Sequence, residues 1–198
     1  MDPEEIEMVN KIKQDKYRFF YPPEFESMLD HLNKNGKFTA SFMINSGARI
    51  NECRGFKQDP IFDNERSNIT LIHTKVRARL KEKTPRSRTI PISKSFFNQL
   101  KRDLPTHRIL STNAFNIALR RACKDANIKM PDQFSSHNIR KTFATWLLSL
   151  GADGFKLAKH LGHTPNELAK DYATNDVFNS KDKQIIRSIL KDLPERIR

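Results

Sequence analysis

The chain of 198 residues is long enough for one domain with its own hydrophobic core. Hydrophobic residues make up 37%, and no apolar run approaches the roughly 20 residues that span a membrane, which excludes a membrane-spanning protein. The N-terminus lacks the pattern of a secretory signal, and the composition favours a soluble protein. Two cysteines, Cys53 and Cys123, exclude a disulfide framework and favour the cytoplasm, while the formal net charge of +13 favours a polyanionic partner such as nucleic acid.

The first part of the chain is predicted to be an arm followed by helices. Residues 1–20 are charged and lack sustained periodicity, which is typical of an arm or a frayed helix. Pro22-Pro23-Glu24 predicts the start of a helix that Gly36 ends. A second helix is predicted from about Phe38, with a small-residue break at 46–52 before it continues to about residue 56.

The middle of the chain is predicted to be a β-hairpin. Residues 68–74 alternate in polarity and are rich in β-formers, and 76–80 is a possible extension of this strand. Residues 84–87 have the composition of a turn, and 88–92 that of the returning strand. Because Pro91 cannot donate a backbone hydrogen bond, we expect it at an edge or at a strand end.

The rest of the chain is predicted to be helical. Apolar periodicity predicts helices over 93–102, 111–127, 135–150, 154–161, 165–172 and 180–193. Thr164 and Glu167 form a capping box with Pro165 in the first turn. The predicted fold class is mainly α with a small antiparallel β-sheet (α+β), organised as an arm over 1–20, one domain over 21–178 and a C-terminal helix or tail over 179–198.

Four short segments contain residue types that can bind or transfer a phosphate. Arg49 follows a Gly-Ala pair at a helix start, where a guanidinium fork can face a phosphate. His137 and Arg140 lie three residues apart, on one face of a helix. His163 follows a glycine, and Tyr172 comes nine residues later. Each segment alone is equally typical of an ordinary core or surface side chain, so only their combination indicates a phosphate site.

Taken together, these segments resemble the catalytic domain of the tyrosine recombinases, the family of phage integrases and Xer-like recombinases. The order is an arginine in G-x-R-x-x-E, a lysine in a hairpin, H-x-x-R, L-G-H and then a tyrosine. The similarity covers about residues 22–177, and the 23 residues from Arg140 to His163 are also typical. The resemblance implies the tyrosine recombinase catalytic-domain fold. It implies a site-specific recombinase or integrase that cleaves and rejoins DNA through a 3′-phosphotyrosyl intermediate, without metal, cofactor or ATP.

The resemblance also implies a role for each matching residue. Tyr172 would be the nucleophile that attacks the scissile phosphate. Arg49 and Arg140 would hold the non-bridging oxygens, and His163 would add a hydrogen bond to them. His137 would help to move the tyrosine proton.

Two further positions match the family pattern. Lys83, eight residues before the proline of the returning strand, matches the lysine that would protonate the leaving 5′ oxygen. Lys75 and Lys81 remain alternatives, because the first strand looks longer than usual and Pro85 stands where glycine is common. Glu52 matches the acidic residue after the first arginine and is expected to support it.

Basic residues outside these motifs are expected to hold the DNA backbone. They are Arg77, Arg79, Lys81, Arg86, Arg88, Arg120, Arg121 and Lys141. The resemblance implies double-stranded DNA as the partner and self-assembly on it as a dimer or tetramer. The helix over 180–193 is expected to pack either on a neighbouring protomer or on its own domain. Because few residues precede the matching region, the chain is expected to be a fragment or a naturally short member such as a fimbrial phase-variation recombinase.

Three other functions fit part of the pattern. A non-catalytic DNA-binding protein of the same fold would share the charge and the helices. A type IB topoisomerase-like relaxing activity would use similar chemistry. A metal enzyme built on His160, His163 and a cysteine is the least favoured, because the two histidines lack an evident third ligand.

Overall fold

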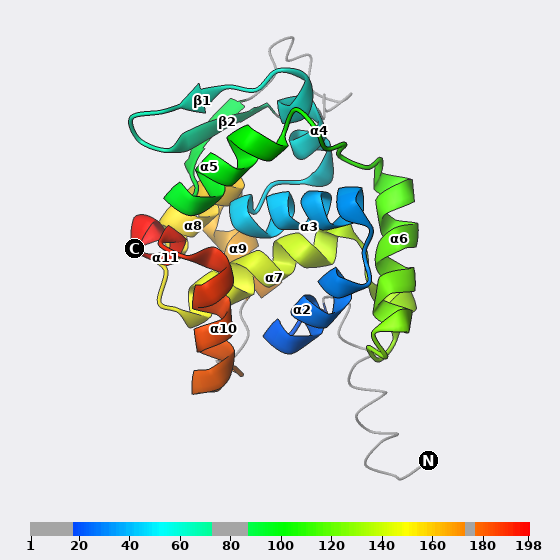
Figure 1. The fold of residues 1–198 in the computed structure, drawn as a ribbon. Coiled ribbons are helices and arrows are strands. Elements are labelled where there is room, and N and C mark those ends of the chain that lie inside the picture. The colour runs from blue at the N-terminus through cyan, green and yellow to red at the C-terminus, as the bar shows by residue number, and fades with distance from the viewer. Residues whose placement is uncertain (1–17, 73–86, 173–176) are drawn as a thin grey trace, which may run out of the picture.

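The computed structural model describes residues 18–72, 87–172 and 177–198, and for residues 169–172 it describes the backbone alone. Within these ranges helices dominate and a small antiparallel sheet covers one end, which confirms the predicted α+β class (Figure 1). The helices are α2 (Pro22–Asp30), α3 (Lys34–Ser46), α4 (Ile50–Gln58), α5 (Lys94–Asp103), α6 (Thr112–Asp125), α7 (Ser136–Ser149), α8 (Gly154–Leu161), α9 (Pro165–Tyr172), α10 (Ser180–Leu190) and α11 (Leu193–Ile197). No helix within the described ranges is long and apolar enough to cross a membrane.

The sheet has the strand order β1 (Phe62–Asp63), β2 (Asn68–Ile72), β3 (Ser87–Pro91), with both pairings antiparallel. The pairing of Ile69 with Ile90 places two buried side chains on the face toward the helices. Pro91 is the last residue of β3, at one edge of the described sheet, in agreement with the sequence. β1 was not predicted, because a strand of two residues is too short to show alternation.

The helix boundary predicted at Gly36 is wrong. Gly36 does not end the first helix: α2 stops at Asp30, and Gly36 lies in the first turn of α3. The cause is Asn33, whose side-chain oxygen accepts the backbone N–H of Gly36 at 2.8 Å and caps α3 three residues earlier. The glycine that ends a helix in this region is Gly47, with a left-handed φ of 63° after the last residue of α3.

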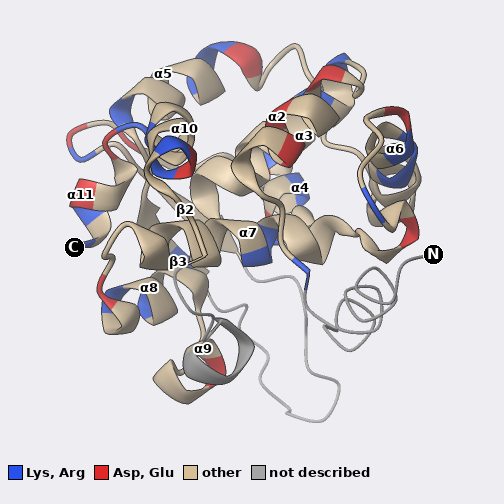
Figure 2. Ribbon diagram, turned by 90° about the horizontal axis from the view of Figure 1, so that it is seen from below, with Lys and Arg blue, Asp and Glu red and all other residues tan. Residues whose placement is uncertain are grey.

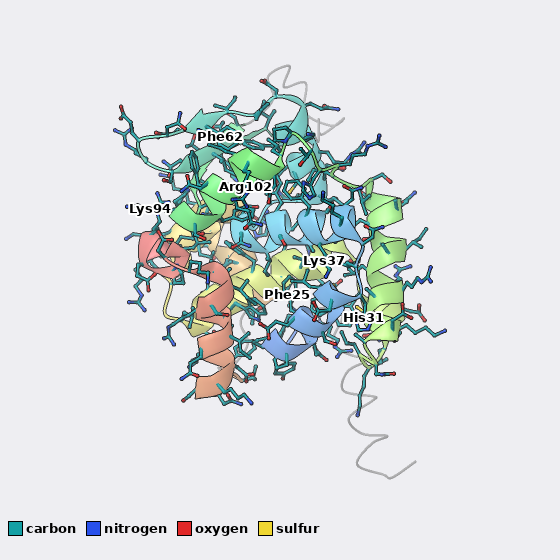
Figure 3. The ribbon with its side chains drawn as sticks, in the orientation of Figure 1. Phe25, His31, Lys37, Phe62, Lys94 and Arg102 are labelled. Carbon is teal, nitrogen blue, oxygen red and sulfur yellow. The ribbon has the colours of Figure 1, made fainter. Side chains whose placement is uncertain are left out.

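The core lies where α3 crosses α7 in the middle of the molecule (Figure 1). Trp146 of α7 is completely buried, and its indole N–H donates to the backbone carbonyl of Phe20 at 3.1 Å. The ring of Phe25 on α2 meets the indole edge-on at 5.4 Å, whereas Lys37 and Arg102 stand on the outer surface (Figure 3). The segment before α2 and the helices α2, α3 and α7 therefore form one packed body.

The C-terminal helices pack on their own domain. Ile186 and Leu190 of α10 are fully buried against α2, α3 and α7, and Leu193 and Ile197 of α11 are buried beside β3. Arg196 ties α11 to the sheet by donating to the backbone carbonyls of Ser67 and Ile92, among others. Packing of this helix on a neighbouring protomer, the other placement that the sequence left open, stays a prediction.

Candidate active site

The turn between α3 and α4 presents Arg49 at a helix start. Gly47 adopts a left-handed conformation, and a Cβ atom there would lie 2.5 Å from the ring of Phe143 on α7. Only glycine lets this turn approach α7 so closely. Arg49 is extended and precedes α4, and its backbone N–H donates to Oε2 of Glu52 at 2.7 Å. The close contact and this capping bond fix where the Arg49 side chain begins.

Arg140 lies inside the molecule, 1% exposed, and ties α7 to two turns. Its Nη1 donates to the backbone carbonyl of Gly47 at 2.6 Å, and its Nη2 donates to that of Leu161 at the end of α8. Nη1 also lies 3.8 Å from Oε2 of Glu52. A buried guanidinium held in this way keeps a fixed orientation, because turning it would leave two carbonyl oxygens unpaired.

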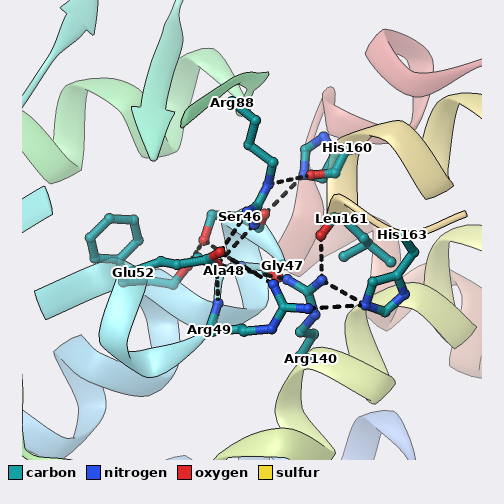
Figure 4. A network of polar contacts seen from close by, with 11 residues as sticks. Ser46, Gly47, Ala48, Arg49, Glu52, Arg88, Arg140, His160, Leu161 and His163 are labelled. Carbon is teal, nitrogen blue, oxygen red and sulfur yellow. Dashed lines mark hydrogen bonds and ion pairs between the residues drawn. The ribbon is translucent and has the colours of Figure 1, made fainter. Parts of the chain in front are cut away.

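His163 brings the third functional group to the same place. Gly162, with φ of 67°, ends α8 and turns the chain so that His163 faces the two arginines. Its Nε2 lies 3.0 Å from Nη2 of Arg140 and 3.3 Å from Nη2 of Arg49 (Figure 4). Because a guanidinium can only donate, Nε2 must accept and the ring proton must reside on Nδ1. Three residues that are far apart in the sequence therefore converge as the resemblance implies.

The carboxylate of Glu52 lies at the centre of this cluster, 1% exposed. Burial would raise its pKa, but the hydrogen bonds and charge of Arg88, the backbone N–H of Arg49 and the charge of Arg140 together lower the pKa from 4.5 to about 2. Glu52 is therefore ionised throughout the physiological range. It supplies the negative charge that allows three arginines to lie close together.

Arg88, expected to hold the DNA backbone, is paired with Glu52 in the structure. Its guanidinium forms two hydrogen bonds to the carboxylate of Glu52, at 2.5 and 2.8 Å, and its side chain is 14% exposed. Lys141, also expected to contact DNA, is 3% exposed within α7. Both side chains lie inward in the structure, and their contact with DNA stays a prediction. The sequence shows that a residue is basic, but tertiary packing decides which way it faces.

His160 is a buried neighbour whose role the sequence did not reveal. Its ring stacks on Phe143, and its Nε2 bonds to the backbone carbonyl of Ser46 at 2.9 Å. Burial, followed by the nearby charges of Arg88 and Arg140, lowers the pKa of His160 from 6.5 to about 3 despite that hydrogen bond. The ring is therefore neutral, with Nε2–H as the donor. Within the described ranges, the structure shows no group of three or more His, Cys, Asp or Glu side chains that could hold a metal ion.

The other expected residues lie at the margins or outside the description. His137 is exposed in the first turn of α7, and α9 ends at Tyr172, whose side chain is not described. Arg120 and Arg121 are exposed on α6, where Nε of Arg120 donates to the Phe134 carbonyl at 3.1 Å. The remaining expected residues lie outside the described ranges: Lys75, Arg77, Arg79, Lys81, Lys83 and Arg86.

Comparisons with known proteins bear on the family and the fold of the chain. The model of the phage integrase family matches residues 18–177. The integrase of Escherichia phage P2 is 26% identical over 170 residues, which are 85% of this chain and 47% of that protein. The chain therefore spans about half the length of that relative.

Two solved structures resemble the fold. The catalytic domain of bacteriophage HP1 integrase has a TM-score of 0.58 and 22% identity, covering 78% of this chain and 86% of that one. XerA recombinase has a TM-score of 0.60 and 17% identity, covering 86% and 62% respectively. At these identities the likeness establishes the fold.

Proposed function

The chain belongs to the phage integrase family and has the fold of a tyrosine recombinase catalytic domain, and from this premise we propose that it cleaves and rejoins DNA through a 3′-phosphotyrosyl intermediate on Tyr172. The observation that carries the proposal is the convergence of Arg49, Arg140 and His163. Two guanidinium groups and an imidazole aimed at one point are suited to a phosphate with developing charge.

The cluster suggests how a phosphate would enter. Nε2 of His163 now accepts hydrogen bonds from both Arg49 and Arg140. A non-bridging phosphate oxygen would accept the same two bonds more strongly, because it carries negative charge. The imidazole would then be released from the arginines to donate to the phosphate, once its proton is on Nε2. In this proposal the histidine occupies the acceptor position while DNA is absent.

The reaction that we propose exchanges one phosphodiester bond for another. The hydroxyl oxygen of Tyr172 attacks phosphorus, the bond to the 5′ oxygen breaks, and the DNA 3′ end becomes linked to the tyrosine. Lys83, or Lys75 in its place, gives a proton to the leaving 5′ oxygen, and His137 takes the tyrosine proton. A new 5′ hydroxyl reverses these steps, so the joining step needs no ATP.

DNA binding would use exposed basic residues around the cluster. Figure 2 shows Lys and Arg positions on the outer side of α6, where Arg121 is 84% exposed. We propose that Arg120, Arg121 and the basic residues expected over 77–86 contact the DNA backbone, and that copies of the protein assemble on double-stranded DNA. In this proposal the assembly on DNA determines the target site, the number of copies and the overall recombination reaction.

The first test is a covalent trap. Duplexes selected from a randomised pool for binding to the protein are nicked so that the cleaved fragment diffuses away, which leaves any phosphotyrosyl adduct stable. Wild-type protein should form an adduct, Tyr172→Phe should form none while keeping its DNA affinity, and Tyr21→Phe should behave as wild type. Equal adduct from wild type and Tyr172→Phe would exclude the proposal. Binding without any adduct would favour the non-catalytic alternative.

A further inference from the structure

Arg88 joins β3 to both turns that present the arginine and histidine groups. Its Nη1 and Nη2 bond to the two carboxylate oxygens of Glu52, at 2.5 and 2.8 Å, and its Nε donates to the backbone carbonyl of His160 at 2.9 Å (Figure 4). All three guanidinium nitrogens are therefore used. A planar fork that meets a carboxylate with two parallel bonds fixes both position and angle, which a lysine ammonium cannot do.

On one side, Arg88 acts on Glu52. The same carboxylate accepts the backbone N–H of Arg49 at 2.7 Å, bonds to Nη1 of Arg49 at 3.3 Å and lies 3.8 Å from Nη1 of Arg140. The position of the Glu52 oxygens therefore determines how far each of these arginines is drawn toward the interior. Arg88 supplies the strongest of the contacts that hold those oxygens in place.

On the other side, Arg88 acts on the turn that carries His163. The His160 carbonyl belongs to the last turn of α8, and a Cβ atom on Gly162 would lie 3.5 Å from Cδ and 3.6 Å from Nη1 of Arg88. The arginine side chain thus lies beside the left-handed turn at Gly162, directly before His163. A shift of Arg88 would move this turn and with it the imidazole.

We propose that Arg88 is a positioning residue for strand cleavage, acting through Glu52 and the turn at Gly162 on Arg49, Arg140 and His163. This inference rests on the function proposed above. The physical reason is competition for the arginines. A buried carboxylate that loses its bidentate partner has to take another cation, and Arg49 and Arg140 are the nearest ones. They would turn toward Glu52 and away from the phosphate.

The competition predicts a specific pattern of variants. Arg88→Met should slow adduct formation at saturating nicked DNA about 10- to 100-fold, while the dissociation constant for DNA changes by less than about threefold. Arg88→Lys should recover only part of the rate, because it restores the charge without the fork. Adding Glu52→Gln to Arg88→Met should also recover part of the rate, since the uncompensated carboxylate is gone.

Arg196→Met is the matched control. Arg196 is another arginine that donates to backbone carbonyls at the same sheet, including that of Ile92 just after β3. Its other hydrogen bonds go to Arg66, Ser67 and Asn68, which lie outside the cluster. Its replacement should lower the melting temperature and leave the rate constant for adduct formation unchanged below that temperature. If Arg88→Met fails to fold, the double variant with Glu52→Gln provides a folded protein for the same rate measurement.

A measurement on DNA-free protein separates this inference from the proposed function. The ¹⁵N resonances of the His163 ring, identified by their loss in His163→Asn, should shift in Arg88→Met and stay unchanged in Arg196→Met. If Arg88→Met forms the adduct at the wild-type rate, or if its His163 ring resonances do not shift, the positioning role is overturned. The proposed function would still stand. Absence of any Tyr172-dependent adduct would overturn the proposed function. The His163 resonances would still show whether Arg88 positions the His163 ring.

Discussion

Glu52 lies among three guanidinium groups, and its charge determines how closely they can approach one another. Two like charges about 5 Å apart repel by about 3 kcal/mol at an effective dielectric constant near 20. One ionised carboxylate between Arg49, Arg88 and Arg140 offsets much of this repulsion. Three cations and one anion still leave an excess of positive charge. That excess is what a phosphate group would neutralise.

Single residues also make the protein sensitive to acid. His160 has a folded-state pKa of about 3 against 6.5 for the free side chain, so the folded protein binds fewer protons than the unfolded chain below pH 6.5. Its contribution to stability should be complete above pH 6.5 and decrease as pH falls toward 3, by at most about 1.4 kcal/mol per pH unit. Glu52, whose pKa is lowered from 4.5 to about 2, should also stabilise the folded protein less as the pH falls, but only below pH 4.5.

Urea unfolding at pH 7, 6 and 5 tests this assignment. The free energy of unfolding of the wild type should decrease over this range. His160→Gln, whose amide can still donate to the Ser46 carbonyl, should show a flatter dependence, whereas Glu52→Gln should alter the dependence only below pH 4.5. An identical slope for wild type and His160→Gln would contradict the account of His160.

For single residues, the meeting of the motif residues could be predicted from the sequence, but the direction in which other basic side chains face could not. The expected meeting of Arg49, Arg140 and His163 is present in the structure, because the family pattern specifies these residues by type and spacing. The inward positions of Arg88 and Lys141 were not predicted, because a basic residue in a strand or an amphipathic helix can face either side. Which side it faces depends on partners distant in sequence, here Glu52 for Arg88.

At the scale of elements, Gly47 controls how the junction of α3 and α4 meets α7. Alanine at this position would be strained by the left-handed φ and would place its Cβ 2.5 Å from the Phe143 ring and 2.9 Å from Leu161. We expect Gly47→Ala to cost about 2–5 kcal/mol in unfolding free energy, from backbone strain and overpacking together. Adduct formation should decrease as well, because the Gly47 carbonyl orients Arg140.

Gly151→Ala provides the comparison for this prediction. Gly151 also has a positive φ, of 83°, but a Cβ atom there would meet nothing within 4 Å. Its replacement should therefore lower the unfolding free energy only by the cost of backbone strain, about 1–2 kcal/mol, as measured by urea unfolding. Equal losses for Gly47→Ala and Gly151→Ala would show that contact with α7 does not matter.

Element types were predictable because apolar periodicity and capping residues are local. The capping box of Thr164 and Glu167 is present, with the Thr164 N–H donating to Oε2 of Glu167 at 2.7 Å. Boundaries were less predictable where two local features compete, as at Gly36, where the cap at Asn33 decides the start of α3. At the C-terminus, the predicted helix over 180–193 is divided at Lys191, whose φ of 55° the sequence did not indicate.

At the scale of the whole molecule, the charge of +13 predicts DNA binding that weakens steeply with salt. Each phosphate contact contributes about 0.9 to the slope of log affinity against log salt. Arg121→Glu on α6 should weaken binding and reduce that slope by about 1. Figure 2 shows α5 on the opposite side of the molecule from α9, so Arg102→Glu, 72% exposed on α5, should leave the slope unchanged. Equal slopes for both variants and wild type would exclude α6 from the DNA-binding surface.

In the proposed reaction Tyr172 becomes bonded to DNA, and mapping the attachment site tests this bond most directly. The trapped adduct is digested with nuclease and protease, and the peptide that carries the remaining nucleotide is identified by mass spectrometry. We predict a nucleotide linked through phosphate to Tyr172, in the peptide that contains the end of α9. Attachment to Tyr17, Tyr21 or any residue other than a tyrosine would contradict it.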